Sequence, residues 1–300
     1  MKTVSSQKLA GVSIGASILT IMMKLSAFAL TNSVSLLSDA LESFVNLLAA
    51  TITFFMVRLA HKPADETHPF GHSKAEYISS IAEGFFIMIA AAAIIFAAVQ
   101  RLFHPAALEA PGLGLLFSVG ASLINLIVGL MLIKNGKKRR SLALEADGHH
   151  LMTDVYTTVG VLIGLAIVYI TKLFILDPII AIIVGLNIIS AGFSIVQKSL
   201  SGFMDSAIDR GYVAFINSIF MEYKQKKIEF HGLRTRCSGS RNFISFHVLV
   251  PGVWTVQNAH SLVEEIEKKL RDTIPNSTID THIEPLEDPV SWADTELDRK

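Results

Sequence analysis

The stretch SVSLLSDALESFVNLLAA, residues 33–50, is apolar but has an acidic or amide side chain at every third or fourth position. These side chains are Asp39, Glu42 and Asn46. A second stretch, ADGHHLMTD at 146–154, repeats the same spacing with Asp147, His150 and Asp154. Spacings of three and four residues put each set on one face of a helix. The sequence therefore predicts two apolar helices, each with one polar face.

Polar faces of this kind are costly at membrane depth, so they normally line a cavity or bind something. Turned toward each other, the two faces would offer carboxylate, amide and imidazole ligands to one small cation. We predict a four-ligand metal site at Glu42, Asn46, His150 and Asp154. Asp39 and Asp147, one turn away, are the predicted carboxylates that orient those ligands. The alternative is that the groups pair with one another, or with Lys24, and only join helices.

The composition of the 300-residue chain fits a membrane protein, because 51% of its residues are hydrophobic. Apolar runs predict six transmembrane helices, near residues 9–30, 34–59, 75–101, 112–133, 143–171 and 176–200. We expect Gly11-x-x-x-Gly15 and Gly160-x-x-x-Gly164 to allow close helix packing, and Glu83 to be a buried acid outside the metal site.

The orientation of the spans in the membrane follows from the positive charges in the short loops, because cytoplasmic loops carry an excess of Lys and Arg. They lie before the first span and after the second and fourth: Lys2, Lys8, Arg58, Lys62, Lys134, Lys137, Lys138, Arg139 and Arg140. Both termini are therefore predicted to be cytoplasmic, which six spans allow. The zero net charge gives no indication of nucleic-acid binding, and the single cysteine, Cys237, excludes a disulfide framework.

The domain organisation changes after about residue 206. Residues 1–206 form the predicted transport domain, 207–288 a soluble domain and 289–300 a flexible tail. Helices near 207–223 and 256–271 and strands near 228–237, 241–250 and 278–284 give an α-β-β-α-β order. This order predicts an α+β domain, an antiparallel sheet with helices on one face.

Two further groups of ligand-type residues lie outside the predicted spans. Asp65, His68 and His72 occupy a loop shaped by prolines and a glycine, where they suit zinc or form only a solvated polar loop. The second group, in the soluble domain, is His231, His247, His260, His282 and Glu284. His282 and Glu284 share one face of a strand, although lone histidines in small domains are often surface or core residues.

Taken together, these stretches resemble the cation diffusion facilitator family of bacterial metal-efflux transporters, including its zinc and ferrous-iron exporters. The resemblance covers nearly the whole chain. It is carried by SVSLLSDALESFVN, ADETHPFGHSKAE, ADGHHLMTD, HGLRTR, QNAH and THIEP, in this order.

The resemblance implies six spans, a cytoplasmic ferredoxin-like domain and a homodimer that exchanges divalent metal for protons across the inner (plasma) membrane. It makes the intramembrane set the transport site, the loop set a second site and the histidine set a metal cluster at the dimer interface. It also implies a salt-bridge latch between protomers at Lys74 and Asp205. Zinc-exporting relatives usually have Asp or His followed four residues later by Asp, where this chain has Glu42 and Asn46.

We therefore expect a metal/proton antiporter, with a divalent metal as both substrate and regulator. Imidazole and carboxylate ligands favour Zn, with Fe, Mn, Co, Ni and Cd as alternatives. The rival interpretation is a membrane receptor that senses metal without transporting it. We do not expect an enzyme, since the chain has no His-Glu-x-x-His metalloprotease motif.

Overall fold

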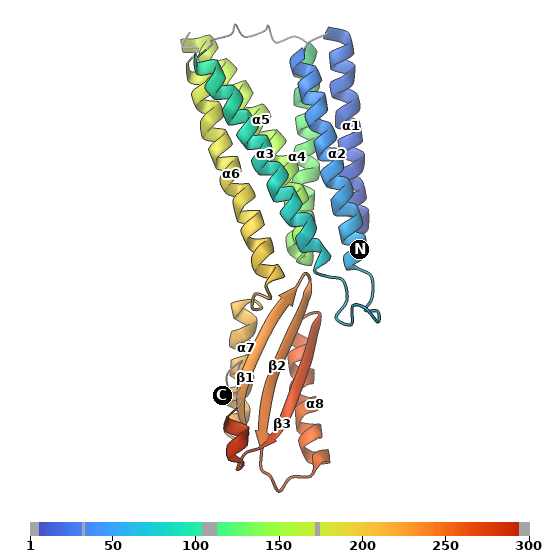
Figure 1. Cartoon of the computed structure of the whole chain (residues 1–300), viewed down its shortest axis with the longest axis vertical. Helices are drawn as coiled ribbons and strands as arrows, with labels where there is room; N and C mark the ends of the chain where they lie inside the picture. Colours follow the sequence, from blue (N-terminus) through green and yellow to red (C-terminus); the bar gives the residue numbers. More distant parts are fainter. Residues whose placement is uncertain (1–5, 32–33, 104–112, 172–174, 294–300) are drawn as a thin grey trace. The chain divides into compact units, whose positions relative to one another are not determined.

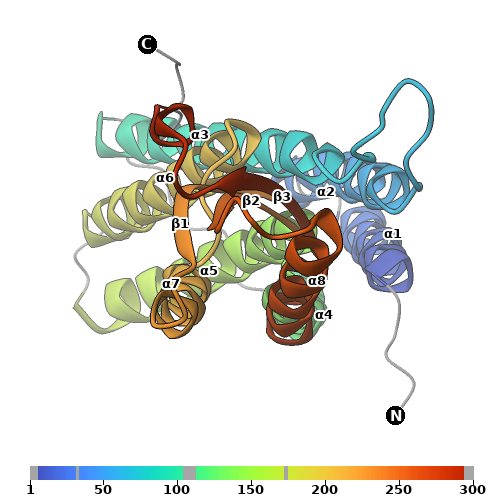
Figure 2. The ribbon, with the colours of Figure 1, turned by 90° about the horizontal axis from the view of Figure 1, so that it is seen from below.

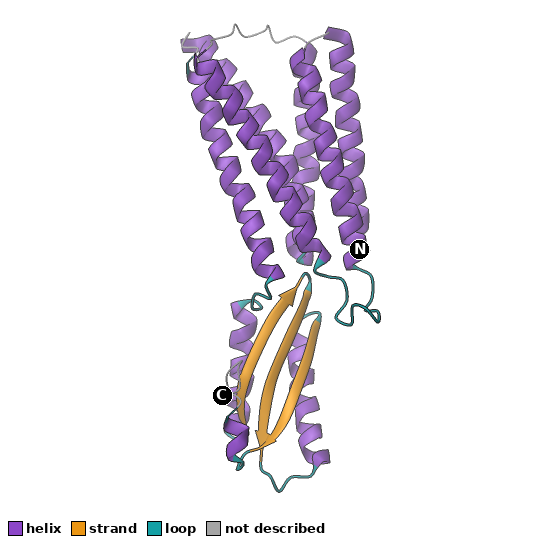
Figure 3. Ribbon diagram, viewed as in Figure 1, coloured by secondary structure: helices purple, strands orange, loops and turns teal. Residues whose placement is uncertain are grey.

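The computed structural model describes residues 6–31, 34–103, 113–171 and 175–293. They form two compact units, residues 1–200 and 201–300, each with a hydrophobic core of its own. Among the described residues, every strand belongs to the second unit (Figure 3).

The first unit is built from long helices, whose arrangement Figure 1 shows. They are α1 (Ser6–Thr31), α2 (Val34–Ala60), α3 (Ala75–Phe103), α4 (Leu113–Arg139), α5 (Leu142–Thr171) and α6 (Leu176–Phe203). Within the described residues, α1, α3, α4 and α6 each contain a segment long and apolar enough to cross a membrane. In the part of α2 whose side chains the structure describes, the apolar segment is Asn46–Ala60. The helix bounds agree with the predicted spans to within three residues, except that α4 continues six residues beyond the predicted 133. The number of membrane crossings stays a prediction.

Glycines allow two close helix crossings in this unit. A Cβ atom on Gly148 of α5 would lie 2.9 Å from the carbonyl oxygen of Gly129 on α4. A Cβ atom on Gly84 of α3 would lie 3.0 Å from the carbonyl oxygen of Gly192 on α6. The first distance is too short for a real Cβ contact and the second is tighter than most, so glycine at these positions lets the helices approach closely.

The glycine pair predicted to pack helices in α1 does not do so. No described atom comes within 4 Å of a Cβ built on Gly11 or Gly15. At Gly160 such an atom would make an ordinary contact, 3.5 Å from Val184. The surroundings of Gly164 lie outside the described residues.

The second unit contains α7 (Arg210–Lys224), β1 (Glu229–Ser238), β2 (Arg241–Val250), α8 (Val256–Thr273), β3 (Ser277–Pro285) and the 3-10 helix η1 (Pro289–Trp292). Its two α-helices begin with side-chain caps that accept otherwise unpaired backbone N–H groups. Asp209 accepts from the Gly211 N–H, and Thr255 accepts from the Asn258 N–H. The order α-β-β-α-β agrees with the predicted order, but part of the predicted tail is folded as η1.

The sheet has the order β1-β2-β3 and is mixed. β1 and β2 pair antiparallel, as expected, whereas β3 runs parallel to β2. The prediction of an antiparallel sheet was therefore wrong for β3. Because α8 carries the chain back along the sheet, β3 starts at the same end as β2, which is the geometry of a β-α-β crossover.

One face of the sheet is covered by α7 and α8, which lie on the same side of it (Figure 2). Alternate residues of β2, Ile244, Phe246 and Val248, join side chains of both helices in the core of this unit. The other face carries His231, opposite His247, which is in turn opposite His282 of β3. Packing of the two helices thus leaves the histidines together on the second face of the sheet.

Candidate metal centres

The polar faces of α2 and α5 meet inside the helical unit. Nε2–H of His150 donates to Oδ1 of Asn46 at 2.6 Å, and Nδ2 of Asn46 donates to Oδ2 of Asp154 at 2.5 Å. All three residues are less than 10% exposed. The amide of Asn46 thus joins the imidazole and the carboxylate that are predicted to bind the metal.

A side chain from a third helix also reaches this group. Asn125 of α4 donates to the same Asp154 oxygen at 2.9 Å. The sequence reasoning missed Asn125, whose signal is an amide within the apolar part of α4. Helix α2 runs through Asp39 and Glu42, but their side chains lie outside the part of the chain that the structure describes.

Glu83 of α3, which the sequence reasoning left outside the site, faces the other side of the His150 ring. Its Oε2 atom lies 3.4 Å from Nδ1 of His150. Its Oε1 atom accepts a hydrogen bond from the hydroxyl of Thr53 at 2.9 Å. Since this hydroxyl also lies 2.8 Å from that of Ser79, Ser79 donates to Thr53. Glu83 is 1% exposed.

Asp147 makes its described hydrogen bond to another helix. Its Oδ1 atom accepts from the hydroxyl of Ser13 at 3.0 Å, which joins α5 to α1. The letters Gly11-x-Ser13-x-Gly15 fit the nucleophile motif of serine hydrolases, but here they lie within a continuous helix instead of a strand-to-helix turn. The contact with Ser13 gives Asp147 a role in joining helices, and its role behind a ligand stays a prediction.

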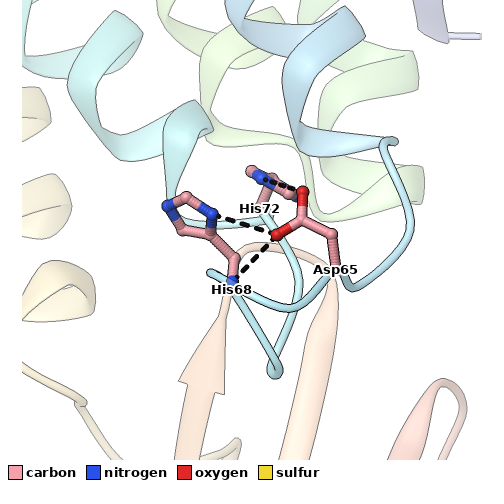
Figure 4. A group of neighbouring side chains, drawn as sticks. All are labelled: Asp65, His68 and His72. Atoms are coloured by element: carbon pink, nitrogen blue, oxygen red, sulfur yellow. Dashed lines mark hydrogen bonds and ion pairs between the residues drawn. The ribbon is translucent and has the colours of Figure 1, made fainter.

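The loop between α2 and α3 brings its three predicted ligands together (Figure 4). The Asp65 carboxylate lies 3.3 Å from Nδ1 of His68 and 3.5 Å from Nε2 of His72. The Lys62 ammonium, 2.7 Å away, and the Thr67 hydroxyl hold the pKa of Asp65 well below its usual range. Asp65 therefore stays ionised at neutral pH, as a metal ligand must.

In the soluble unit three of the five predicted ligands converge. Oε2 of Glu284 lies 2.8 Å from Nε2 of His231 and 3.3 Å from Nδ1 of His247. His282 is 3.7 Å from the other oxygen of Glu284 and is largely exposed. His260 lies on α8, exposed and outside this group. The structure thus places one carboxylate at the centre of a set of imidazoles on the sheet.

The two residues of the predicted latch lie in different units. Asp205 accepts from Nη1 of Arg236 at 3.3 Å, within the soluble unit. Lys74 lies in the turn just before α3 and is half-buried. The latch between protomers stays a prediction.

Family models match both units of the chain. The model described as the cation efflux transmembrane domain matches residues 11–204. This chain belongs to the cation efflux family. The model of the family's cytoplasmic domain matches residues 213–286, from α7 to the end of β3.

Curated relatives of the cation efflux family cover nearly the whole chain. An uncharacterized transporter of Synechocystis is 48% identical over 93% of this chain and 90% of its own. The cation-efflux pump FieF of Yersinia enterocolitica is 32% identical over 90% of this chain and 89% of its own. FieF of Shewanella oneidensis is 28% identical over 92% of each. The protein is therefore a multi-pass membrane transporter of divalent cations and not an enzyme.

Proposed function

We propose that this transporter exports a divalent transition metal from the cytoplasm in exchange for protons. Zinc is the first candidate, with Fe, Mn, Co, Ni and Cd as alternatives. The observation that carries the proposal is the buried contact of Asn46, His150 and Asp154 between α2 and α5. Imidazole and carboxylate are suitable ligands for zinc. Ionisable residues within membrane helices are rare and commonly mark ion pathways. Glu42, on the same face of α2, would complete the four-ligand site.

The architecture proposed for this function has six membrane spans, with both termini in the cytoplasm and the protein in the plasma membrane. The soluble unit would be a ferredoxin-like domain that pairs with its copy in a homodimer. Its matching family model is named for dimerisation, which supports this assembly. We assign the ligands of the regulatory metal to His231, His247, His260, His282 and Glu284. Asp65, His68 and His72 would hold a further ion.

Coupling to protons follows from the ligands. Imidazole and carboxylate must be deprotonated to bind metal, so binding releases protons and protons on the far side displace the metal. Asn46 has no proton to exchange, so we expect fewer protons per ion than in a site made only of ionisable groups. In the soluble unit, metal loading would join two protomers and favour one state of the helices by its higher affinity for that state.

The test is zinc uptake into vesicles that contain the purified, full-length chain. A pH gradient should drive uptake, and Asp154→Ala should abolish it. Tyr156→Ala changes an exposed residue of the same helix and serves as the matched control. Uptake that ignores the pH gradient would refute antiport, and metal binding without any uptake would indicate a receptor instead.

A further inference from the structure

His150 has two ring nitrogens, and the proposed metal site uses only one of them. Nε2 points to Asn46, which links it to Asp154. Nδ1 points to Oε2 of Glu83 at 3.4 Å. Both Nδ1 and this oxygen are fully buried and have no hydrogen-bond partner among the described residues. Each is therefore the natural partner of the other.

The Glu83 carboxylate is held in place by a chain of side-chain hydrogen bonds. The hydroxyl of Ser79 donates to Thr53, and the hydroxyl of Thr53 donates to Oε1 of Glu83. Thr53 comes from α2 and Ser79 from α3, so two helices fix the carboxylate. A buried carboxylate destabilises a protein unless it is paired. Besides Thr53, which bonds to Oε1, the carboxylate meets the repulsive charge of Asp147 and the His150 ring, and among the described residues only the ring offers Oε2 a hydrogen-bond donor.

The hydrogen bond to Asn46 determines which nitrogen of the His150 ring carries a proton in this structure. Oδ1 of Asn46 only accepts, so Nε2 of His150 carries a proton in this arrangement. A metal ion can bind Nε2 only when that nitrogen carries no proton, so the neutral, metal-binding ring must be the tautomer whose one proton is on Nδ1. A metal-binding histidine usually donates this other N–H to a carboxylate, which fixes its tautomer and orientation.

We propose that Glu83 is a positioning residue, which accepts the Nδ1–H of His150 and so presents the Nε2 lone pair to the transported ion. This inference rests on the proposed function. Among the described residues no other carboxylate lies against the ring: Asp147 bonds to Ser13, and Glu145 faces the neighbouring His149 at 3.9 Å. The role expected of Asp39 or Asp147, behind a ligand, is thus assigned to an acid on α3.

The test measures zinc flux in vesicles with the full-length chain and two variants of Glu83. Glu83→Leu removes the acceptor and should raise the KM for Zn²⁺ by about 10- to 100-fold, since losing such a partner weakens metal binding by this factor. The maximal rate per folded protein should stay unchanged, whereas a merely structural defect would lower it and leave KM alone. Glu83→Gln keeps a weaker, neutral acceptor, so its KM should fall between wild type and Glu83→Leu.

Matched controls come from Glu145, a carboxylate that faces a histidine outside the site. Glu145→Leu and Glu145→Gln should leave KM unchanged. An unchanged KM in Glu83→Leu, or an equal rise in Glu145→Leu, would overturn the inference. If Glu83→Leu does not fold, a wild-type KM in Glu83→Gln overturns it.

The same assay separates the two proposals. If Asp154→Ala abolishes the zinc flux but the Glu83 variants have the wild-type flux, the inference about Glu83 is refuted and the proposed transport function is supported. Absence of wild-type flux would overturn both.

Discussion

Replacing Asn46 with aspartate tests the intramembrane site through charge. Nδ2 of Asn46 now donates to Asp154 at 2.5 Å. Asn46→Asp exchanges this donor for a second carboxylate. At a relaxed separation of about 4 Å, two unit charges repel by about 4 kcal/mol at an effective dielectric constant of about 20. An ion bound between the carboxylates removes this repulsion and gains affinity.

The repulsion sets the size of the effect. About 4 kcal/mol corresponds to a ceiling of about 10³-fold in affinity, because about 1.4 kcal/mol is tenfold. Protonation of one carboxylate before the ion arrives reduces the gain, so we expect a KM for Zn²⁺ that is about 10- to 100-fold lower. Tighter binding also slows release, so the maximal rate should fall.

The assay is zinc flux in vesicles over a range of zinc concentrations. The matched control is Asn135→Asp, which changes an amide on the same helix as Asn125. Its Nδ2 donates to the backbone carbonyl of Met131 at 2.8 Å. The KM of this control should equal that of the wild type. If Asn46→Asp has an unchanged or higher KM, the ion does not bind between residues 46 and 154.

Three further changes test the rest of the account. Gly148→Ala places a Cβ against the backbone of α4 and should lower the stability of the helical unit by about 1–3 kcal/mol in thermal unfolding, whereas Gly15→Ala, with open space around it, should not. Glu284→Ala removes the carboxylate shared by the histidines and should abolish tight zinc binding to residues 201–300 in calorimetry; unchanged binding would contradict the cluster. Tyr223→Phe removes a hydroxyl that accepts from Lys269 at 2.8 Å, donates to Glu265 at 2.6 Å and holds the pKa of Glu265 below its usual range. The variant should lose about 1 kcal/mol in urea unfolding at neutral pH. Because the folded-state pKa is the lower one, the part of this loss that comes from ionised Glu265 is present above the ordinary carboxyl pKa and disappears as the pH falls through the lowered value. A loss that does not change with pH would refute the assignment.

Much of the fold follows from periodicity along the chain. Apolar runs predicted all six long helices, and alternation predicted the three strands to within a few residues. The direction of β3 was missed because strand pairing depends on where α8 returns the chain, which alternation does not report. The close crossing of Gly129 and Gly148 was missed because only the opposite helix reveals which glycines meet.

The intramembrane site was likewise predicted only in part from the sequence. Spacing of three and four residues identified the polar faces of α2 and α5, and the structure brings Asn46, His150 and Asp154 together. Spacing says nothing about single polar residues contributed by other helices. Asn125 and Glu83 are of this kind, since neither belongs to a run of metal-ligand residues like those of α2 and α5, and only the packing places them against Asp154 and His150.

The central claim is that α2 and α5 hold the transported ion between them. Anomalous diffraction at the zinc edge, from crystals of the full-length chain soaked in Zn²⁺, tests it most directly. The account predicts a peak about 2.0–2.1 Å from Nε2 of His150 and within bonding distance of the Asp154 carboxylate. Peaks confined to the loop of Asp65 and the cluster around Glu284, with none beside His150, would contradict it.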